Sequence, residues 1–411
     1  MANVSSSNGL EKHPKLRFPG FDEPWNESKL SACFAKNIKK NTDGSISNVI
    51  CNSAKMGLIP QRDYFDKDIA NSDNTSGYYI IERDDFVYNP RKSSDAPYGP
   101  ISRYTYSEAG IVSPLYLCFR AKGNVDSNFF EWYFRSSAWH RYIYMTGDSG
   151  ARHDRVSIKD TDFFAMPIRY PSTTEQEKIA SFLTAIEERI SSQQLLVDNL
   201  KKYKRGLLRD IFSKLNVRHD KRKLKDVAVL FADGDWIESK DQAPDGIRLV
   251  QTRNVGFGVY IDKPQNAKYI SEATFHRLNC LEIYDGDILI SRLPEPAGRA
   301  CLLPQSAERR ITAVDCTVIR TDKSVIDRTY LLQFLCSDQY LKTVNSFLAG
   351  GTRQRISRKN LEGIEVPYPS IDQQRYYGSF LCKVDARITN AENRLNCLSR
   401  LRCFMLQQLF I

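Results

Sequence analysis

The sequence lacks the features of several large protein classes. It contains no apolar run near the about 20 residues that a membrane-spanning helix requires, and Met1–His13 has no apolar core of the kind found in signal peptides. Its ten cysteines include no C-x-x-C pair, and its five histidines do not cluster beside them. A metal site and a disulfide framework are therefore not expected, and a reducing, cytoplasmic environment fits the composition best.

Catalytic motifs are equally scarce. No G-x-x-x-x-G-K-[ST] loop for ATP phosphates is present. Asn89-Pro90-Arg91-Lys92 has only part of the Asn-Pro-Pro-aromatic motif of amino-methyltransferases, because it lacks the second proline and the aromatic residue that would stack on the target base. Asp235 and Glu238-Ser-Lys240 imitate the Asp…Glu-x-Lys pattern of nuclease metal sites, but this short, common pattern favours a polar loop here. The chain is therefore expected to bind rather than to catalyse.

What the sequence does contain is a long internal repeat. Residues 171–212 align without a gap to residues 369–410 at an offset of 198, and eleven of these 42 positions are identical. Weaker matches continue upstream, among them Asp85 with Asp287 and Arg120 with Arg320. Because a period near 200 residues is too long for a solenoid, the repeat indicates a duplicated domain.

Each copy of the repeat ends in a predicted long helix. Apolar residues recur every three or four positions, interrupted at Gln193 and its counterpart Ala391. Each helix begins with a capping-box pattern after a proline, Ser172-Thr-Thr-Glu175 and Ser370-Ile-Asp-Gln373. A helix of some 40 residues is about 60 Å long at ~1.5 Å per residue, too long to pack fully against one adjoining domain. We therefore expect the two apolar stripes to face each other as an antiparallel, coiled-coil-like pair.

Two unrelated amphipathic helices on separate cores are the alternative to this pairing. The residues expected to pair the helices or to dock a partner are Phe182, Ile186, Ile190, Val197, Leu200, Leu207, Phe380, Val384, Ile388, Leu395, Leu398 and Met405.

The regions that precede the two helices predict two α+β domains. Residues 1–13 are expected to be disordered, 14–170 to form the first domain, 171–214 the first helix, 215–369 the second domain and 370–411 the second helix. Residues 128–144 and 330–347 predict helices. Short apolar or alternating runs predict strands at 77–81, 86–88, 115–119, 247–251, 287–291 and 317–320.

Basic residues are concentrated in loops at matching places of the two copies. The net charge of +10 favours a polyanionic partner, although charge alone is a weak signal. Arg can recognise guanine bidentately, Asn and Gln can recognise adenine, and Lys neutralises phosphate, although any single Arg is more often a surface or phosphate contact. The candidate DNA-binding residues are Lys39, Lys40, Arg91, Lys92, Arg103, Arg152, Arg155, Arg253, Asn254, Arg292, Arg299, Arg353, Gln354, Arg355, Arg358 and Lys359.

Together these features resemble the DNA-specificity (S) subunit of a type I restriction-modification system. The order of variable domain and long helix, twice over, is accompanied by the phrases Leu16-Arg-Phe-Pro-Gly-Phe21, Glu175-Gln-Glu-Lys-Ile-Ala180 and Tyr284-Asp-Gly-Asp-Ile-Leu-Ile-Ser-Arg292, and the resemblance extends from Pro14 to Ile411. It implies two target-recognition domains in pseudo-twofold duplication, each contacting one half of a bipartite, asymmetric DNA target. It also implies that the helices set the spacing and dock two modification (methyltransferase) subunits.

The resemblance implies no cofactor in this chain. S-adenosylmethionine, ATP and Mg2+ are expected in the modification subunits and in the restriction (motor and nuclease) subunits, double-stranded DNA is expected as the direct ligand, and no membrane partner is expected. Three alternatives stay open: a self-sufficient methyltransferase or nuclease, a coiled-coil scaffold that does not bind DNA, and the recognition subunit of a modification-only system.

Overall fold

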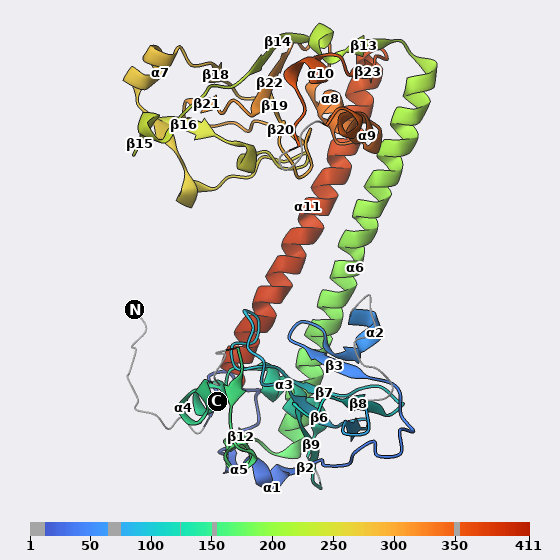
Figure 1. Cartoon of the computed structure of the whole chain (residues 1–411), viewed down its shortest axis with the longest axis vertical. Helices are drawn as coiled ribbons and strands as arrows, with labels where there is room; N and C mark the ends of the chain where they lie inside the picture. The colour runs from blue at the N-terminus through green and yellow to red at the C-terminus, as the bar shows by residue number, and fades with distance from the viewer. Residues whose placement is uncertain (1–12, 65–74, 124, 150–153, 349–353) are drawn as a thin grey trace. The chain divides into compact units, whose positions relative to one another are not determined.

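The computed structural model of the chain describes residues 13–64, 75–123, 125–149, 154–348 and 354–411 (Figure 1). The chain divides into two compact units. Unit 1 comprises the residues up to Ser192 together with Leu395–Ile411, and unit 2 comprises Gln193–Arg394. Each unit therefore contains one globular part and a section of each of two long helices.

The long helices follow the two globular parts in the sequence. Helix α6 spans Thr173–Arg218 and helix α11 spans Ile371–Gln408. Helix α6 continues beyond residue 214 because Leu215, on its last turn, is buried in the core of unit 2. Among the described residues, no helix combines the length and the apolar character needed to cross a membrane.

Unit 1 is built on the antiparallel sheet β2-β9-β6-β7, with four two-stranded pairs around it: β1-β12, β3-β4, β5-β8 and β10-β11. Its strands are β1 (Asn26–Lys29), β2 (Phe34–Lys36), β3 (Ile50–Ser53), β4 (Gly57–Pro60), β5 (Tyr79–Ile81), β6 (Phe86–Tyr88), β7 (Ile101–Arg103), β8 (Gly110–Val112), β9 (Leu117–Ala121), β10 (Asp148–Ser149), β11 (Val156–Ser157) and β12 (Pro167–Tyr170). Its short helices are α1 (Leu30–Cys33), α2 (Gln61–Tyr64), α3 (Ser127–Arg135), α4 (His140–Thr146) and α5 (Asp160–Phe164).

Unit 2 is built on the antiparallel sheet β14-β22-β19-β20, and a five-stranded sheet, β15-β17-β16-β21-β18, lies farther from α11 (Figure 1). Its strands are β13 (Lys221–Lys223), β14 (Ala228–Asp233), β15 (Gln242–Ala243), β16 (Ile247–Val250), β17 (Tyr269–Ile270), β18 (Glu282–Ile283), β19 (Ile288–Ser291), β20 (Ala300–Leu302), β21 (Arg310–Thr312), β22 (Cys316–Thr321) and β23 (Glu365–Pro367). Its short α-helices are α7 (Glu272–Leu278), α8 (Arg328–Leu335), α9 (Asp338–Ser346) and α10 (Arg358–Glu362).

The two units repeat the same strand order, which confirms the predicted α+β fold and its duplication. The four-stranded sheets β2-β9-β6-β7 and β14-β22-β19-β20 correspond strand by strand. Even a parallel contact recurs, because Val49 pairs with Ile111 in unit 1 and Leu249 pairs with Ile311 in unit 2. The five-stranded sheet of unit 2 has no full equivalent in the described part of unit 1, so the units differ at their outer edges.

An ion pair between a buried carboxylate and a partly exposed guanidinium recurs at the matched Asp and Arg positions. Arg120 Nη2 lies 2.8 Å from Asp85 Oδ2, and Arg320 Nη2 lies 2.8 Å from Asp287 Oδ2. Each carboxylate is almost fully buried and also accepts a backbone N–H, from Glu82 at 2.8 Å or from Tyr284 at 2.9 Å. The carboxylate thus closes the turn before a central strand and ties it to the neighbouring strand, which explains why these two residue types match between copies.

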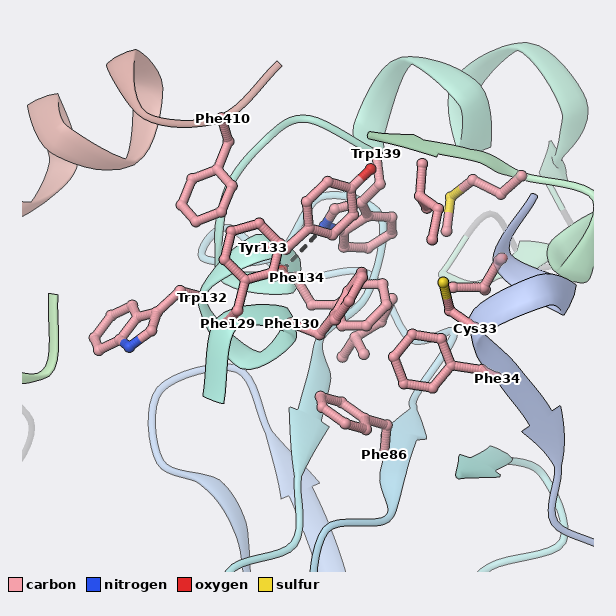
Figure 2. Close-up of a cluster of buried hydrophobic side chains, with 14 of the residues drawn as sticks. Cys33, Phe34, Phe86, Phe129, Phe130, Trp132, Tyr133, Phe134, Trp139 and Phe410 are labelled. Carbon is pink, nitrogen blue, oxygen red and sulfur yellow. Dashed lines mark hydrogen bonds between the residues drawn. The ribbon is translucent and has the colours of Figure 1, made fainter. Parts of the chain in front are cut away.

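The core of unit 1 is unusually aromatic. Figure 2 shows rings from Phe34, Phe86 and Phe130 packed together, with Phe34 and Phe130 at a centroid distance of 5.0 Å. Phe410, next to the chain end, closes this core against Phe129 at 5.5 Å. Aromatic pairs in such edge-to-face arrangements add about 0.5–1.5 kcal/mol each beyond their buried area.

The two helices predicted over residues 128–144 and 330–347 are each broken in two, so the prediction of continuous helices was wrong. The chain leaves the helix at Ser136, whose Oγ donates to Tyr133 O at 2.6 Å, and restarts at His140. In unit 2, Ser337 adopts an extended conformation and its Oγ accepts from Tyr340 N at 3.2 Å, which caps α9. A serine that bonds its own backbone competes with the helix, and the apolar periodicity continues across the break.

The two capping boxes differ. Ser370 and Gln373 form one at the start of α11, with the Ser370 N–H donating to Gln373 Oε1 at 3.3 Å and the Gln373 N–H donating to Ser370 Oγ at 3.4 Å. At α6 the predicted box was wrong for its acidic member, because Glu175 is buried and its carboxylate accepts two hydrogen bonds of 2.8 Å from the Arg17 guanidinium. A charged partner from outside the helix therefore replaces the local cap.

Within each unit the sections of α6 and α11 pair through equivalent residues. Arg402 contacts Glu187 at 2.7 Å in unit 1, and their counterparts Lys204 and Asp385 make an ion pair of 2.5 Å in unit 2. In unit 2, Gln193, which interrupts the apolar stripe, donates from Nε2 to Ala391 O at 2.9 Å. Because residue numbers rise on α6 where they fall on α11, the helices are antiparallel.

The predicted pairing residues differ in their exposure. Ile186, Val197, Val384 and Ile388 are buried, whereas Phe380 is 36% exposed. The half-buried members are Phe182, Ile190, Leu200, Leu207, Leu395, Leu398 and Met405.

Candidate nucleic-acid interface

In each unit the loop after a central strand meets a second chain segment that carries a candidate arginine. In unit 1 the loop of residues 89–100 follows β6, and Val156 N donates to Pro90 O at 2.9 Å. In unit 2 the loop of residues 292–299 follows β19, and Ile356 N donates to Arg292 O at 3.2 Å. This backbone hydrogen bond therefore recurs at matched positions of the two units. It brings Arg91 beside Arg155 in unit 1 and Arg292 beside Arg355 in unit 2.

In unit 1 this junction lines a cleft of about 550 Å³. Arg91 and Arg155, both exposed, pair through a single β-bridge, and Lys92 N donates to Asp154 O at 2.8 Å. Met56 and Leu115 also line the cleft and are about 60% exposed. Three predicted residues thus share a concave, cationic surface with apolar walls, an arrangement suited to an anionic ligand that also presents flat apolar groups.

The floor of this cleft is fixed by two asparagines. Asn52 is buried and donates from Nδ2 to Val87 O at 2.8 Å, while it accepts from Ser102 Oγ at 2.7 Å. Asn89 donates from Nδ2 to Asn52 O at 3.0 Å and accepts the Arg91 N–H at 3.1 Å. Asn89 therefore shapes the loop that carries Arg91, and sequence reasoning had no signal for Asn52.

In unit 2 two of the predicted DNA-binding arginines face inward. Arg292 is 4% exposed and lies 3.3 Å from Asp233 Oδ2, and burial lowers the pKa of its guanidinium. Arg299 donates to the carbonyl oxygens of Val255 at 2.7 Å and of Leu293 at 2.8 Å, and burial lowers its pKa as well. These guanidiniums hold loops in place, so they position the surface rather than present themselves to a ligand.

Asn254 also faces the interior. It is 4% exposed, its Oδ1 accepts the Gln251 N–H at 3.0 Å, and its Nδ2 donates to Ile261 O at 2.9 Å. Its amide therefore shapes the loop that it occupies.

The other described candidates are dispersed. Arg103 is held by Glu131 at 2.8 Å, Lys39 lies 3.4 Å from Glu82, and Arg355 lies 3.7 Å from Asp315. Arg253 donates to Asn266 O, and Arg358 pairs with Glu362 at 3.1 Å. Lys40, Gln354 and Lys359 are exposed. Arg152 and Arg353 lie outside the described residues.

The nuclease-like pattern in unit 2 forms a polar turn, as expected. Asp235 Oδ2 accepts the Leu281 N–H at 2.9 Å, and burial raises the pKa of the Asp235 carboxyl. Glu238 pairs with Lys240 at 2.9 Å. Over the described ranges, no group of three or more His, Cys, Asp or Glu side chains is placed to hold a metal ion.

Comparisons with known proteins bear on this arrangement. Residues 216–400 match the family model for the type I restriction modification DNA specificity domain. The chain is 22% identical over 295 residues to the type I restriction enzyme MjaVIII specificity subunit of Methanocaldococcus jannaschii, covering 67% of this chain and 68% of that protein. It is 21% identical over 241 residues to a protein assigned as the MjaX specificity subunit of the same organism, covering 56% of this chain and 55% of that protein.

The chain is thus similar to type I restriction-modification specificity subunits, and the family model matches within residues 216–400. The match spans about half the length of the MjaX relative and about two thirds of the MjaVIII relative.

Solved structures extend the likeness in fold to nearly the whole chain. The S subunit of a type I restriction-modification system from M. genitalium matches with a TM-score of 0.55 and 15% identity over 97% of this chain and 99% of that chain. A chain from a type I system studied for complex assembly and conformational transition matches with a TM-score of 0.58 and 17% identity over 96% of this chain and 99% of that chain. The fold of a specificity subunit is therefore present in both units, including unit 1, of which the family model matches only residues 395–400.

Proposed function

We propose that the chain is the non-catalytic DNA-specificity subunit of a type I restriction-modification complex. Each unit contacts one half of a bipartite DNA target through the loops at the end of its central sheet. The observation that carries the proposal is the recurring junction between these loops, with Arg91 and Arg155 in unit 1 and Arg355 in unit 2 on its exposed side. Arg side chains on such loops suit base edges and phosphates of duplex DNA.

The two half-sites are expected to differ. The matched junctions carry different residues, since Asn89-Pro90-Arg91 in unit 1 is replaced by Ser291-Arg292-Leu293 in unit 2. The outer sheets differ as well, with five strands in unit 2. A duplicated scaffold with divergent loops therefore fits an asymmetric target rather than a palindrome.

The long helices supply the surface for the modification subunits. Several large apolar side chains on α6 and α11 stay exposed, including Leu195 at 62%, Tyr376 at 68% and Phe404 at 49%. Exposed apolar residues on a long helix suit a protein partner. The partner subunits bring S-adenosylmethionine, ATP and Mg2+ and carry out methylation, translocation and cleavage, while this chain selects the sequence.

The deciding experiment is single-molecule methylation mapping in cells that express this chain with its cognate modification subunit. We expect a methylated, bipartite, non-palindromic motif. A chain lacking residues 229–357, most of the globular part of unit 2, should abolish it, while Lys15→Ala, on the exposed N-terminal segment, should leave it unchanged.

Two results would contradict the proposal. An assembled complex without any motif, and without duplex binding, would identify a scaffold. Methylation by the purified chain alone, with no modification subunit present, would identify a self-sufficient enzyme. A motif without restriction of incoming DNA would place the chain in a modification-only system.

A further inference from the structure

Each unit presents a large apolar side chain on a tight turn, and in unit 2 Val259, on the same turn, is exposed as well, at 57%. Met56 lies between β3 and β4 and is 60% exposed, and Phe257 lies between the bridged residues Val255 and Tyr260 and is 47% exposed. The two positions correspond at an offset of 201, within the range of 198 to 202 that relates the two copies. The same unusual exposure therefore occurs twice at one place in the fold.

The turns are built to hold these side chains outward. Met56 and Phe257 are each followed by a glycine with positive φ, +70° at Gly57 and +77° at Gly258, a conformation that other residues adopt only with strain. At Gly256 a Cβ would lie 2.6 Å from Val259 O, so the turn before Phe257 requires glycine too. The apolar side chain is thus carried by a tight, glycine-containing turn, which leaves it accessible to a ligand.

Each turn is anchored to the loop that forms the candidate interface. In unit 1 the anchor is Asn52, one residue before the end of β3, whose backbone oxygen accepts from Asn89 Nδ2 at 3.0 Å and whose Nδ2 donates to Pro100 O at 3.3 Å, both on the interface loop. In unit 2 the anchor is Arg299, whose guanidinium bonds Val255 O at 2.7 Å on the turn and Leu293 O at 2.8 Å on the interface loop. Asn52 in unit 1 and Arg299 in unit 2 thus both fix the turn to the interface loop.

Basic residues accompany both turns. Met56 lines the cleft that also contains Arg91, Arg155 and Lys55. In unit 2 the exposed Arg253 precedes the turn that carries Phe257. A ligand that binds basic residues and an apolar side chain at the same time must have an anionic surface. It must also have apolar groups close beneath that surface. Duplex DNA has both, since its phosphates surround a stack of bases.

We propose that Met56 and Phe257 are wedges that insert at a base-pair step, one in each half-site, and unstack it. This deepens the proposed function, on which it rests. Phe and Met are among the residues that open base steps in DNA-bending proteins, where unstacking is offset by the contacts that the bent duplex gains. Cations around the tip would hold the backbone of the kinked duplex while the apolar side chain fills the opened step.

The test uses the complete chain in complex with its modification subunit and a duplex that carries the mapped motif, with 2-aminopurine placed in turn at each step of each half-site. Binding of the parent complex should raise 2-aminopurine fluorescence at one step per half-site. Met56→Ala should remove the signal in one half-site only, and Phe257→Ala in the other. Each change should weaken binding about tenfold, the scale of a lost stacking contact.

Three comparisons separate a wedge from other roles. The salt dependence of binding should keep its slope, because no cation is removed. Met56→Leu and Phe257→Leu, which keep apolar bulk, should retain most of the signal. Val229→Ala, at an exposed apolar position on β14, should change nothing.

The outcomes also separate this proposal from the proposed function. A parent complex that binds no duplex overturns both. A parent complex that binds its motif without any fluorescence change, or whose signal survives both alanine variants, overturns the wedge alone. Loss of complex assembly in the alanine variants, with duplex binding by the free chain unchanged, would make the tips protein contacts and would also overturn it.

Discussion

At the scale of residues, the arginines divide into two groups that their sequence context does not separate. Arg91 and Arg155 project from the loop junction of unit 1, whereas Arg292 and Arg299 are used inside unit 2 to hold loops. All four lie in Gly- or Pro-containing loops with similar neighbours. The two groups differ in the hydrogen-bond acceptors that their guanidiniums meet. A backbone carbonyl such as Val255 O cannot be recognised as an acceptor from the sequence.

Substitution of Arg155 should therefore affect binding to DNA directly. If its guanidinium contacts a phosphate, Arg155→Ala should reduce the slope of log K against log salt by about 1 and weaken binding to all sequences alike. If it contacts guanine, the loss should be about 1–3 kcal/mol and should relax the motif at one position. Titrations at several salt concentrations distinguish the two cases. Lys15→Ala removes one charge away from the junction and should reproduce neither effect.

The ion pairs of Arg309 predict how the stability of the folded chain depends on pH. It lies 2.7 Å from Glu272 and 2.8 Å from Glu282, and its hydrogen bonds are the main cause that lowers the pKa of both carboxyls below the ordinary value of 4.5. A carboxyl whose pKa is lowered by folding stabilises the protein above its unfolded pKa, and this contribution is lost as pH falls through its folded pKa.

Arg309→Gln should thus be less stable than the parent near pH 7, and the difference should narrow steadily below about pH 4.5. Urea denaturation midpoints at pH 7, 5 and 3 would measure this. Lys323→Gln, at an exposed lysine of the same unit, should differ from the parent by the same amount at all three pH values. If the difference in urea midpoint between Arg309→Gln and the parent grew as the pH fell, the stabilising role of these ion pairs would be contradicted.

At the scale of elements, the long helices combine an apolar stripe with a few buried glutamines, two of which hold the helix starts and one of which bonds the facing helix. Gln176 and Gln374 occupy matched positions, and each donates to a proline carbonyl at 2.9 Å, Pro171 O or Pro369 O. Gln193 sits in the stripe itself and bonds the facing helix at Ala391 O. A polar residue inside a helix pair typically specifies register at some cost in stability.

Removing this contact should have a measurable effect. Gln193→Ala should lower the free energy of unfolding of the chain by about 1 kcal/mol, the usual value of one buried hydrogen bond. Gln194→Ala is the matched control, because Gln194 is exposed and bonds only Asp198 of its own helix among the contacts described. Equal effects of the two substitutions in urea denaturation would show that Gln193 contributes nothing specific.

Much of the element pattern could be predicted, and the failures have physical causes. The apolar runs 86–88, 247–251 and 287–291 are strands because both faces of these segments are buried, which gives an unmistakable pattern. The helix breaks at Ser136 and Ser337 were missed, since a serine is compatible with a helix and only its own hydrogen bond shows the break. Glu175 was assigned to a local cap because its true partner, Arg17, lies 158 residues away.

At the scale of the whole molecule, two helices cross the boundary between the units, α6 at residue 192 and α11 at residue 394. Under the proposed function, these helices set how many base pairs lie unrecognised between the half-sites. Inserting four residues at both boundaries lengthens the helices by about 6 Å and turns them by a little more than one revolution. With an axial rise of about 3.4 Å per base pair, the spacer should grow by about two base pairs.

Methylation mapping would measure the change directly. Both half-site sequences should stay as they are, because no loop has been altered. Insertion in α6 alone is the control and should abolish the motif by breaking the register of the helix pair. A motif with an unchanged spacer after the double insertion would show that the helices do not set the spacing.

The duplication and the family were accessible from the sequence, whereas the candidate interface was accessible only in part. The repeat at an offset of 198 lies in the long helices, where a shared stripe restricts change. The interface loops differ between copies, so a matched pair such as Met56 and Phe257 is recognised only from the exposure of the two side chains and the positive φ of the glycine that follows each. The surfaces expected to choose the target are those that the repeat conserves least.

The C-terminal residues of unit 1 have a consequence for biosynthesis. Leu409 and Phe410 complete an aromatic core whose other buried members lie between Trp25 and Leu183, and Leu16 N donates to Gln408 O at 3.0 Å. Unit 2 is a single stretch of chain and can close while the ribosome is still translating. Unit 1, although begun first, remains unfinished until Leu395–Ile411 have been made, so the two units are completed in the reverse of the order in which they are begun.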